Sequence, residues 1–181
     1  VTIDEKPEHI ISDIEALGWN IKPFLENGTL NILDITNYFK DSNDITSGKQ
    51  DISQIIDVIL NYIKDNSVKR LGIDPISPLI FKDIQLPLIS YYIRKIIFSL
   101  EEYKECTTLL TSYVPVGSTK ISQHGIEEFA ASGIVLLRLT KNNNKFIRSI
   151  WIRKMRGTRI DLSEYSFEIL PSRGIVLRQA L

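Results

Sequence analysis

Two adjacent carboxylates, Asp4 and Glu5, follow the apolar run Val1-Thr2-Ile3. We interpret residues 1–4 as a short buried strand, and ligands in open parallel sheets bind beyond the carboxyl ends of the strands. A carboxylate in that position can orient a water molecule or take a proton from it. Acidic residues just before Pro7 would also stabilise the N-terminus of a helix, so the pair alone allows both interpretations.

Asp74 closes a second apolar run, Leu71-Gly72-Ile73. This pattern is that of a Walker B aspartate, which holds Mg²⁺ through water while phosphate oxygens ligate the metal directly. Many buried strands end in aspartate, so the pattern has low specificity. It makes Asp74 a candidate for binding a metal and a nucleotide.

Basic residues are concentrated between Ala130 and Ile160, a segment that contains no acidic residue. The basic residues are Arg138, Lys141, Lys145, Arg148, Arg153, Lys154, Arg156 and Arg159. Such charge on a β element indicates a nucleotide, a nucleic acid or the acidic face of a partner. A solvated, salt-bridged surface is the other interpretation. Strand alternation predicts that Arg153 and Lys154 point to opposite faces, until Gly157 ends the strand.

Other kinds of site are not supported by the sequence. The Walker A pattern G-x-x-x-x-G-K-[ST] is absent, because the Gly48-Lys49 pair is followed by Gln50. His9 and His124 lack partners at zinc-ligand spacing. Cys106 lies in an apolar run and is interpreted as a core residue rather than a nucleophile.

The composition is that of an ordinary globular protein, with 43% hydrophobic and 24% charged residues. A length of 181 residues predicts one domain, and one cysteine fits a reducing cytosol. No apolar run reaches the length of a membrane-spanning helix, so a membrane partner is not expected. The net charge is zero, but residues 1–90 carry 8 basic and 14 acidic residues, and residues 91–181 carry 14 and 8. Because the chain begins with Val1 rather than methionine, we expect a fragment of a longer chain.

The elements that must position these residues alternate between strands and helices up to residue 110. Apolar residues at helical spacing predict helices, and short apolar runs between them predict strands. The predicted strands are 1–4, 30–34, 70–74 and 106–110; the predicted helices are 7–17, 51–63 and 86–103, with a cap at Asp51; and residues 36–50 are predicted as a surface loop. Such alternation implies right-handed crossovers and a parallel sheet.

Only β-type runs follow residue 130, without helices between them. They are residues 134–139, 146–152, 167–170 and 175–177. The first two are joined by Lys141-Asn142-Asn143-Asn144-Lys145, which predicts a hairpin tip. The predicted fold class is therefore α/β, with a parallel core completed by a C-terminal antiparallel β extension.

Six collinear segments, which are spread over almost the whole chain, form a more specific pattern. They are Val1–Pro7, Leu17–Asn20 with Asn27–Asp34, Leu71–Asp74, Thr107–Ser112, Gly125–Arg138 and Lys154–Thr158. The last reads Lys-Met-Arg-Gly-Thr. In this order the segments resemble the KaiC family, a branch of the RecA-like ATPases, and the last one matches the K-M-R-G-T signature of that family outright.

The resemblance implies a RecA-like P-loop NTPase core in a head-to-tail ring, usually of six subunits, with ATP bound at each subunit interface. Carried over by position, Asp4 and Glu5 would activate the attacking water, and Asp74 would help to hold Mg²⁺. The first strand and the phosphate-binding loop would have to lie upstream of Val1. We therefore expect these 181 residues alone neither to bind ATP tightly nor to hydrolyse it.

The resemblance also implies a role for the basic half of the chain. Lys154 and Arg156 would reach the γ-phosphate of the neighbouring subunit's ATP, and Thr158 would contact the same nucleotide. The acidic half would then surround the metal site, while the basic half would face the next triphosphate. Such a heterologous interface closes into a ring.

The chain departs from the family pattern in three respects. Asp4 stands where the family usually has glutamate, and Ile160 stands where it often has histidine. Glu128 and Phe129 occupy the positions of a phosphorylatable Ser/Thr pair, which argues against autokinase activity.

The predicted function is ATP hydrolysis by a cytoplasmic ring protein that acts in signalling or regulation. One alternative is a DNA-binding relative of the recombinases, in which residues 138–159 contact phosphates. Another is an ATP-sensing scaffold that binds the nucleotide but hardly hydrolyses it, with which the shorter Asp4 side chain is consistent.

Overall fold

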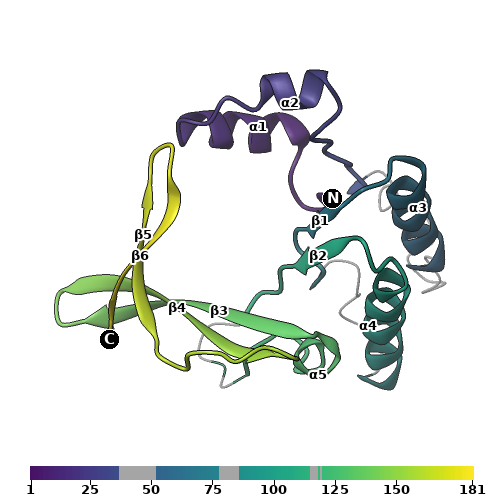
Figure 1. Ribbon diagram of the computed structural model, residues 1–181. Helices are drawn as coiled ribbons and strands as arrows, with labels where there is room; N and C mark the ends of the chain where they lie inside the picture. The colour runs from purple at the N-terminus through teal and green to yellow at the C-terminus, as the bar shows by residue number, and fades with distance from the viewer. Residues whose placement is uncertain (37–51, 78–85, 115–117, 119) are drawn as a thin grey trace. The chain divides into compact units, whose positions relative to one another are not determined.

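The computed structural model describes residues 1–36, 52–77, 86–114, 118 and 120–181 (Figure 1). Gly48-Lys49, Asp51 and nearly all of the predicted loop at 36–50 lie outside these residues. The chain divides into two compact units. The first unit comprises Val1–Ile10 and Asn31–Ala130, and the second comprises Ile11–Leu30 and Ala131–Leu181. Compact units can belong to one domain or to two, so the single domain over residues 1–181 stays a prediction.

A short parallel sheet forms the centre of the first unit. Strand β1 (Arg70–Ile73) pairs in parallel with β2 (Thr107–Leu110), as predicted, from Arg70 opposite Thr107 to Ile73 opposite Leu110. Thr2 adds a single parallel bridge to Asp74 on one side and to Asp34 on the other. Across the sheet, the segment at Asp34 therefore lies next to the segment at Thr2, which lies next to β1, and β1 lies next to β2.

Residues 1–4 and 30–34 do not form the strands that we predicted. Each segment contributes a single bridging residue, Thr2 or Asp34, with hydrogen bonds from Thr2 N to Leu33 O (2.9 Å) and from Ile35 N to Thr2 O (3.1 Å). The chain turns immediately after Thr2, whose hydroxyl donates a hydrogen bond of 2.6 Å to the carbonyl of Glu5. The turn ends the extended conformation before a ladder can form.

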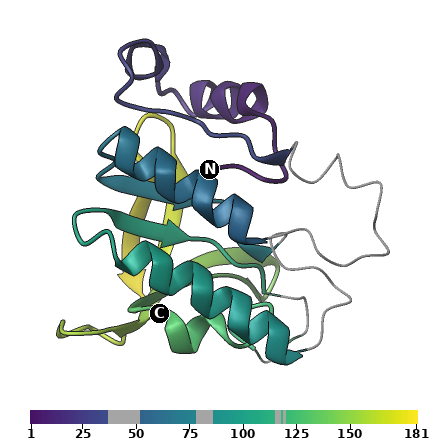
Figure 2. The same ribbon diagram turned by 90° about the vertical axis from the view of Figure 1, so that its right-hand side faces the viewer.

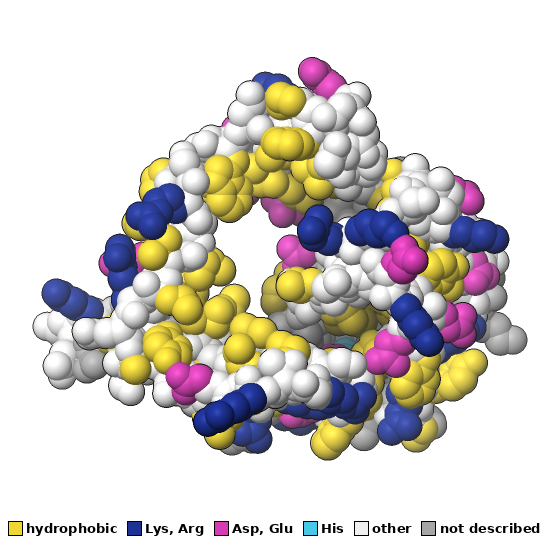
Figure 3. All heavy atoms as spheres, in the orientation of Figure 1, with side chains coloured by type: hydrophobic (Ala, Val, Ile, Leu, Met, Phe, Trp, Pro, Cys, Tyr) yellow, Lys and Arg dark blue, Asp and Glu magenta, His cyan; other side chains and the backbone are white. Residues whose placement is uncertain are grey.

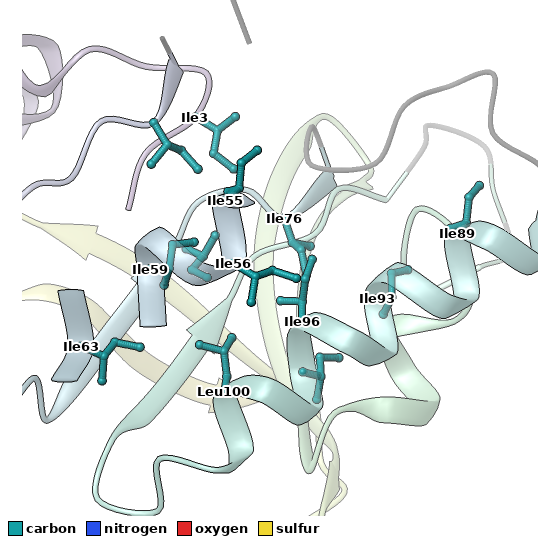
Figure 4. Close-up of a cluster of buried hydrophobic side chains, with 13 residues drawn as sticks. Ile3, Ile55, Ile56, Ile59, Ile63, Ile76, Ile89, Ile93, Ile96 and Leu100 are labelled. Atoms are coloured by element: carbon teal, nitrogen blue, oxygen red, sulfur yellow. The ribbon is translucent and has the colours of Figure 1, made fainter. Parts of the chain in front are cut away.

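Two amphipathic helices cover one face of this parallel pair. Helices α3 (Ile52–Asp65) and α4 (Leu86–Glu101) lie side by side in front of the strands in Figure 2. Both begin and end near the predicted limits. Their apolar residues recur at helical spacing and form most of the core in Figure 4, which is almost entirely isoleucine. The buried core residues are Ile3, Ile35, Ile55, Ile56, Ile59, Ile63, Ile73, Ile76, Ile89, Ile93, Ile96, Ile97 and Leu100.

The second unit contains the predicted antiparallel sheet, with strand order β3-β4-β5-β6. Its strands are β3 (Gly133–Asn142), β4 (Lys145–Met155), β5 (Tyr165–Leu170) and β6 (Gly174–Ala180). All four are longer than predicted. The β3–β4 hairpin closes through Asn143 and Asn144 alone, because Asn142 and Lys145 already pair, and Asn143 adopts φ +53°.

The Leu17-Gly18-Trp19 segment joins the end of helix α1 (Pro7–Ala16) to the tip of the β5–β6 hairpin. Gly18 ends the helix, as predicted, with φ +86°, and a Cβ there would lie 2.5 Å from the hydroxyl of Ser172. Ser172 N donates to Leu17 O at 2.6 Å, and the Trp19 ring lies against Gly174. This contact gives the L-G-W motif a structural role within the second unit.

Two short helices were not predicted, α2 (Lys22–Glu26) and α5 (Glu127–Ala130). Each spans little more than one turn, which is too short for an apolar periodicity to be read from the sequence. None of the helices formed by the described residues is long and apolar enough to cross a membrane.

Candidate functional site

The predicted acidic residues Asp4, Glu5 and Asp74 lie at one edge of the first unit's parallel sheet. Thr2 is 2% exposed and forms a parallel bridge with Asp74, so the chain runs in the same direction at both residues. Asp4 and Glu5, which come after Thr2, therefore lie at the same edge of the sheet as Asp74, which comes after β1. Carboxyl ends of parallel strands share one edge of a sheet, which is where such sheets bind ligands. All three carboxylates are exposed there. The structure thus brings Asp4, Glu5 and Asp74 to the same edge.

The side chain of Asp74 is held by the neighbouring strand. Thr111, just after β2, donates its hydroxyl to Oδ1 of Asp74 at 2.5 Å. The backbone fixes this arrangement, because Thr111 N donates to Ile73 O at 3.1 Å and Ile76 N donates to Thr111 O at 2.9 Å. A hydrogen bond to a charged acceptor is among the stronger ones in proteins, so it restricts the orientation of this carboxylate.

The turn that carries Asp4 and Glu5 is held by two threonine hydroxyls. Thr2 donates to the carbonyl of Glu5 at 2.6 Å, and Thr36 donates to the carbonyl of Ile3 at 2.9 Å. Thr36 is itself oriented, because its N–H donates to Oδ1 of Asp34 at 2.8 Å. The two hydroxyls fix the backbone on both sides of Asp4, while the acidic side chains stay exposed.

The donors at this edge fit a hard cation that is bound together with a phosphate. Asp74 supplies carboxylate oxygens, the ligand type that Mg²⁺ prefers, and Thr111 orients them. No group of three or more His, Cys, Asp or Glu residues that could hold a metal occurs among the described residues. Mg²⁺ is usually held by one or two carboxylates, substrate phosphates and water, so this donor set suits Mg²⁺ with a nucleotide and does not suit an all-protein cage.

The second unit carries the basic candidates at the end of β4. A bulge interrupts the β3–β4 ladder, because Ile134 pairs with Lys154 while Val135 pairs with Ile152. The extra residue is Arg153, so the strict alternation that we predicted for Arg153 and Lys154 does not hold. The bulge lies directly before the Lys-Met-Arg-Gly-Thr segment and bends the strand there.

Lys154 is engaged within its own unit rather than directed freely to solvent. Its ammonium group donates to the carbonyl of Ala131 at 2.6 Å, and its side chain is half-buried. Burial, with a smaller effect from the charge of Arg156, lowers the pKa of Lys154. A lysine has three N–H donors, so a phosphate could share this group with Ala131.

Arg156 and Thr158 lie in the turn that follows β4, and both are exposed. Arg156 N donates to Ser132 O at 2.9 Å, and Thr158 N donates to Met155 O at 3.3 Å. Gly157 between them adopts φ +69°, a conformation that favours glycine, which explains the glycine in this motif. The Met155 side chain lies over Gly133, where a Cβ would come within 2.8 Å of its sulfur.

A buried carboxylate that we did not predict lies near the exit of β2. Glu127 is 8% exposed and accepts hydrogen bonds from Ser112 Oγ (3.1 Å), His124 N (3.3 Å) and Ile126 N (3.1 Å). Burial raises its pKa, but hydrogen bonds from backbone N–H groups, with a contribution from Ser122, outweigh burial and lower it. Through these hydrogen bonds, Glu127 connects α5 and the loop before it to Ser112, the residue after Thr111.

The candidate residues thus form two groups. Asp4, Glu5 and Asp74 belong to the first unit, and Lys154, Arg156 and Thr158 belong to the second. Sequence reasoning missed the threonines that hold the acidic group. The available signal was a polar residue beside each acid: Thr2 precedes Asp4-Glu5 by two residues, and Thr36 follows Asp34 by two.

Comparison with known proteins gives consistent matches over the whole chain. The family profile described as "ATPase: KaiC" matches residues 1–181. A UPF0273 protein of Methanocaldococcus jannaschii is 30% identical over 185 residues, which cover 98% of this chain and 73% of the relative. The circadian clock oscillator protein KaiC of Acaryochloris marina is 28% identical over 169 residues, which cover 93% of this chain and 32% of that protein.

A solved structure extends the likeness from sequence to fold. The crystal structure of a KaiC-like protein from Pyrococcus horikoshii superimposes with a TM-score of 0.80 at 28% identity. The match covers 98% of this chain and 74% of that one. The α/β class that we predicted is confirmed, with a small parallel sheet and a four-stranded antiparallel sheet.

Proposed function

Because the chain belongs to the KaiC family of ATPases, we propose that it contributes to ATP hydrolysis at the carboxyl edge of its parallel strands. Family membership confirms the resemblance predicted from the six sequence segments. The observation that carries the proposal is the pair of parallel bridges made by Thr2. Because of them, Asp4 and Glu5 lie at the same edge of the sheet as Asp74.

Each residue of the acidic group has a distinct role in this proposal. Glu5 takes a proton from the attacking water, and Asp4 orients that water. Asp74, oriented by Thr111, helps to hold Mg²⁺ through water. When bound with the nucleotide, Mg²⁺ neutralises charge on the phosphates.

The basic group acts on a nucleotide held by a neighbouring copy. Lys154 and Arg156 reach its γ-phosphate, and Thr158 contacts the same nucleotide, so that copies arranged head to tail close into a ring, with six subunits proposed. Two features support this division of labour. The basic group belongs to a different compact unit from the acidic group, and residues 130–160 contain eight basic residues and no acidic one.

Glu5→Gln in the intact protein that contains this chain tests the proposal. Glutamine keeps the shape of the side chain but cannot accept the proton, and loss of general-base catalysis typically costs about 10²–10⁴ in rate. We expect ATP binding to persist while hydrolysis falls at least ~10-fold. Unchanged turnover would remove the base role from Glu5, and nucleotide binding without turnover in the unmodified protein would instead favour the ATP-sensing scaffold.

A further inference from the structure

One face of the β3–β4 hairpin carries a mixed cationic and apolar patch near its tip. Lys141 pairs directly with Phe146, and Leu139 pairs with Arg148. Cross-strand partners and residues two apart along a strand lie on the same face of a sheet. These four residues, which we call the tip patch, therefore form a square with cations on one diagonal and apolar side chains on the other.

The apolar side chains of the tip patch are strongly exposed. Phe146 is 67% and Leu139 is 63% exposed, and Lys141 and Arg148 are also exposed. Figure 3 shows hydrophobic side chains gathered over the sheet of the second unit, with basic side chains around them. The same face continues away from the tip with Leu137 (54% exposed) and Val135 (51% exposed), so Phe146 lies at the basic end of an exposed apolar surface.

The cations of the tip patch are not neutralised by the residues around them. Ion pairs such as Lys22–Glu15, Lys69–Glu105 and Arg178–Glu168 lie elsewhere, and among the described residues no carboxylate pairs with Lys141 or Arg148. On the opposite face, Arg138 lies 4.5 Å above the centre of the Trp151 ring. That cation has an aromatic partner within the sheet.

Protection of a sheet edge explains only part of the tip patch. β3 is an edge strand among the described strands, and charged side chains on edge strands discourage pairing with another chain. That role accounts for Lys141, but an exposed Phe146 would promote association rather than prevent it. A ligand with both a flat face and negative charge would match the ring of Phe146 and the two cations beside it.

We propose that the tip patch binds single-stranded nucleic acid. Lys141 and Arg148 contact neighbouring phosphates, Phe146 stacks on a base, and Leu139 supports the base beside it. Segments rich in Lys and Arg and free of acidic residues attract polyanions, and residues 130–160 are such a segment. A duplex keeps its bases stacked inside, so the phenylalanine favours the single strand.

An anionic membrane is the competing ligand for the tip patch. Each Lys or Arg near an anionic surface contributes about 1 kcal/mol, and stable membrane anchoring needs a second strong apolar signal. Leu137 and Val135 add exposed apolar area on the same face, so vesicle binding is the outcome that would assign this face to a membrane. A stacked base, in contrast, needs only one aromatic ring.

Fluorescence anisotropy with a labelled 20-nucleotide oligo(dT) tests this proposal on the intact protein, between 50 and 200 mM salt. Phe146→Ala should weaken binding at least about fivefold without changing the salt dependence. The double variant Lys141→Gln with Arg148→Gln should weaken the salt dependence. The slope of log affinity against log salt should become less negative by ~1.4, which corresponds to two lost phosphate contacts. Phe146→Trp should retain binding and show fluorescence quenching on stacking.

Matched variants outside the hairpin serve as controls. Phe98→Ala removes another exposed aromatic side chain, on α4, and Lys64→Gln removes another exposed cation, on α3. Both should bind the oligonucleotide as the unmodified protein does. Absence of binding at 50 mM salt, or equal binding by the tip-patch variants, would overturn the proposal. Loss of binding to phosphatidylserine vesicles in these variants, with oligonucleotide binding unaffected, would assign the tip patch to membranes instead.

Discussion

The hydroxyl of Thr111 lies 2.5 Å from Oδ1 of Asp74, and this hydrogen bond joins the exits of two adjacent parallel strands. Asp74 is exposed, so without a partner its carboxylate would be free to rotate. The neighbouring strand therefore sets the direction in which this acid presents its oxygens. Loss of a residue that orients a metal-binding side chain typically costs about 10–100-fold in metal affinity or activity.

Thr111→Val should weaken the response to Mg²⁺. Valine keeps the branched shape of threonine but cannot donate to Asp74, and loss of such an outer-shell hydrogen bond costs about 10–100-fold in metal affinity. We expect the Mg²⁺ concentration for half-maximal ATPase activity of the intact protein to rise by ~10-fold. Thr111→Ser retains the hydroxyl and should stay near the original value. Identical Mg²⁺ titrations for the valine and serine variants would contradict a role for this hydrogen bond.

Thr36→Val tests how firmly the Asp4–Glu5 turn must be held. The hydroxyl of Thr36 donates to the carbonyl of Ile3 at 2.9 Å, and its loss should cost about 1 kcal/mol of folding stability. Small displacements of catalytic groups are expensive in rate, so we expect kcat for ATP to fall by ~10-fold while KM changes little. Thr36→Ser is the control. A parallel loss of kcat and nucleotide binding would indicate general damage to the sheet rather than misplacement of the turn.

Local patterns in the sequence were sufficient to predict most of the helices and the antiparallel sheet. The isoleucines of α3 and α4 recur at helical spacing, so their burial could be predicted without knowing what covers them. The β3–β4 hairpin was likewise predictable from two β-type runs around an asparagine-rich tip, although pairing continues closer to the tip than composition suggested.

The details that position the candidate site depend on contacts between distant segments. Thr36 is 33 residues from Ile3, and Thr111 is 37 residues from Asp74. A threonine near a strand indicates only β propensity, so its hydrogen-bond partner cannot be read from the sequence. The bulge at Arg153 could not be read from the sequence either, because it arises from the register of β3 against β4.

Glu127→Gln should reveal a stability contribution that depends on pH. The pKa of Glu127 is lowered in the folded protein, from an ordinary value of 4.5, so its ionised form is the stabilising one. That contribution is fully present above the ordinary pKa and is lost as the pH falls through the lower folded-state pKa. We therefore expect Glu127→Gln to lower the free energy of unfolding by about 1–3 kcal/mol at pH 7, and by less at pH 4.

Urea denaturation at the two pH values measures this difference. Glu102→Gln is a suitable control, because Glu102 is exposed and its removal should leave stability within about 0.5 kcal/mol at both pH values. If Glu127→Gln were equally destabilising at pH 7 and pH 4, the loss would reflect altered packing. The ionised carboxylate would then not be the group that holds the loop before α5.

Arg156→Ala tests the proposal that one subunit completes the ATP site of the next. Arg156 is exposed in the turn after β4, so its removal should cost no more than ~0.5 kcal/mol of stability. Arginines that act in trans in phosphoryl transfer contribute about 10³–10⁵ in rate, so hydrolysis by the intact protein should fall strongly. Thermal unfolding alongside the ATPase assay would separate this loss from a folding defect.

Mixing two inactive variants distinguishes action in trans from action within one subunit. Subunits with Arg156→Ala retain Glu5, and subunits with Glu5→Gln retain Arg156. In a mixed ring, some interfaces combine an intact Glu5 with an intact Arg156 from the adjacent subunit, so activity should return. If both residues served one site within the same subunit, every site would lack one of them and no mixture could recover activity. Failure to recover activity in rings shown to contain both variants would therefore refute the trans role and leave Arg156 as a surface or nucleic-acid contact.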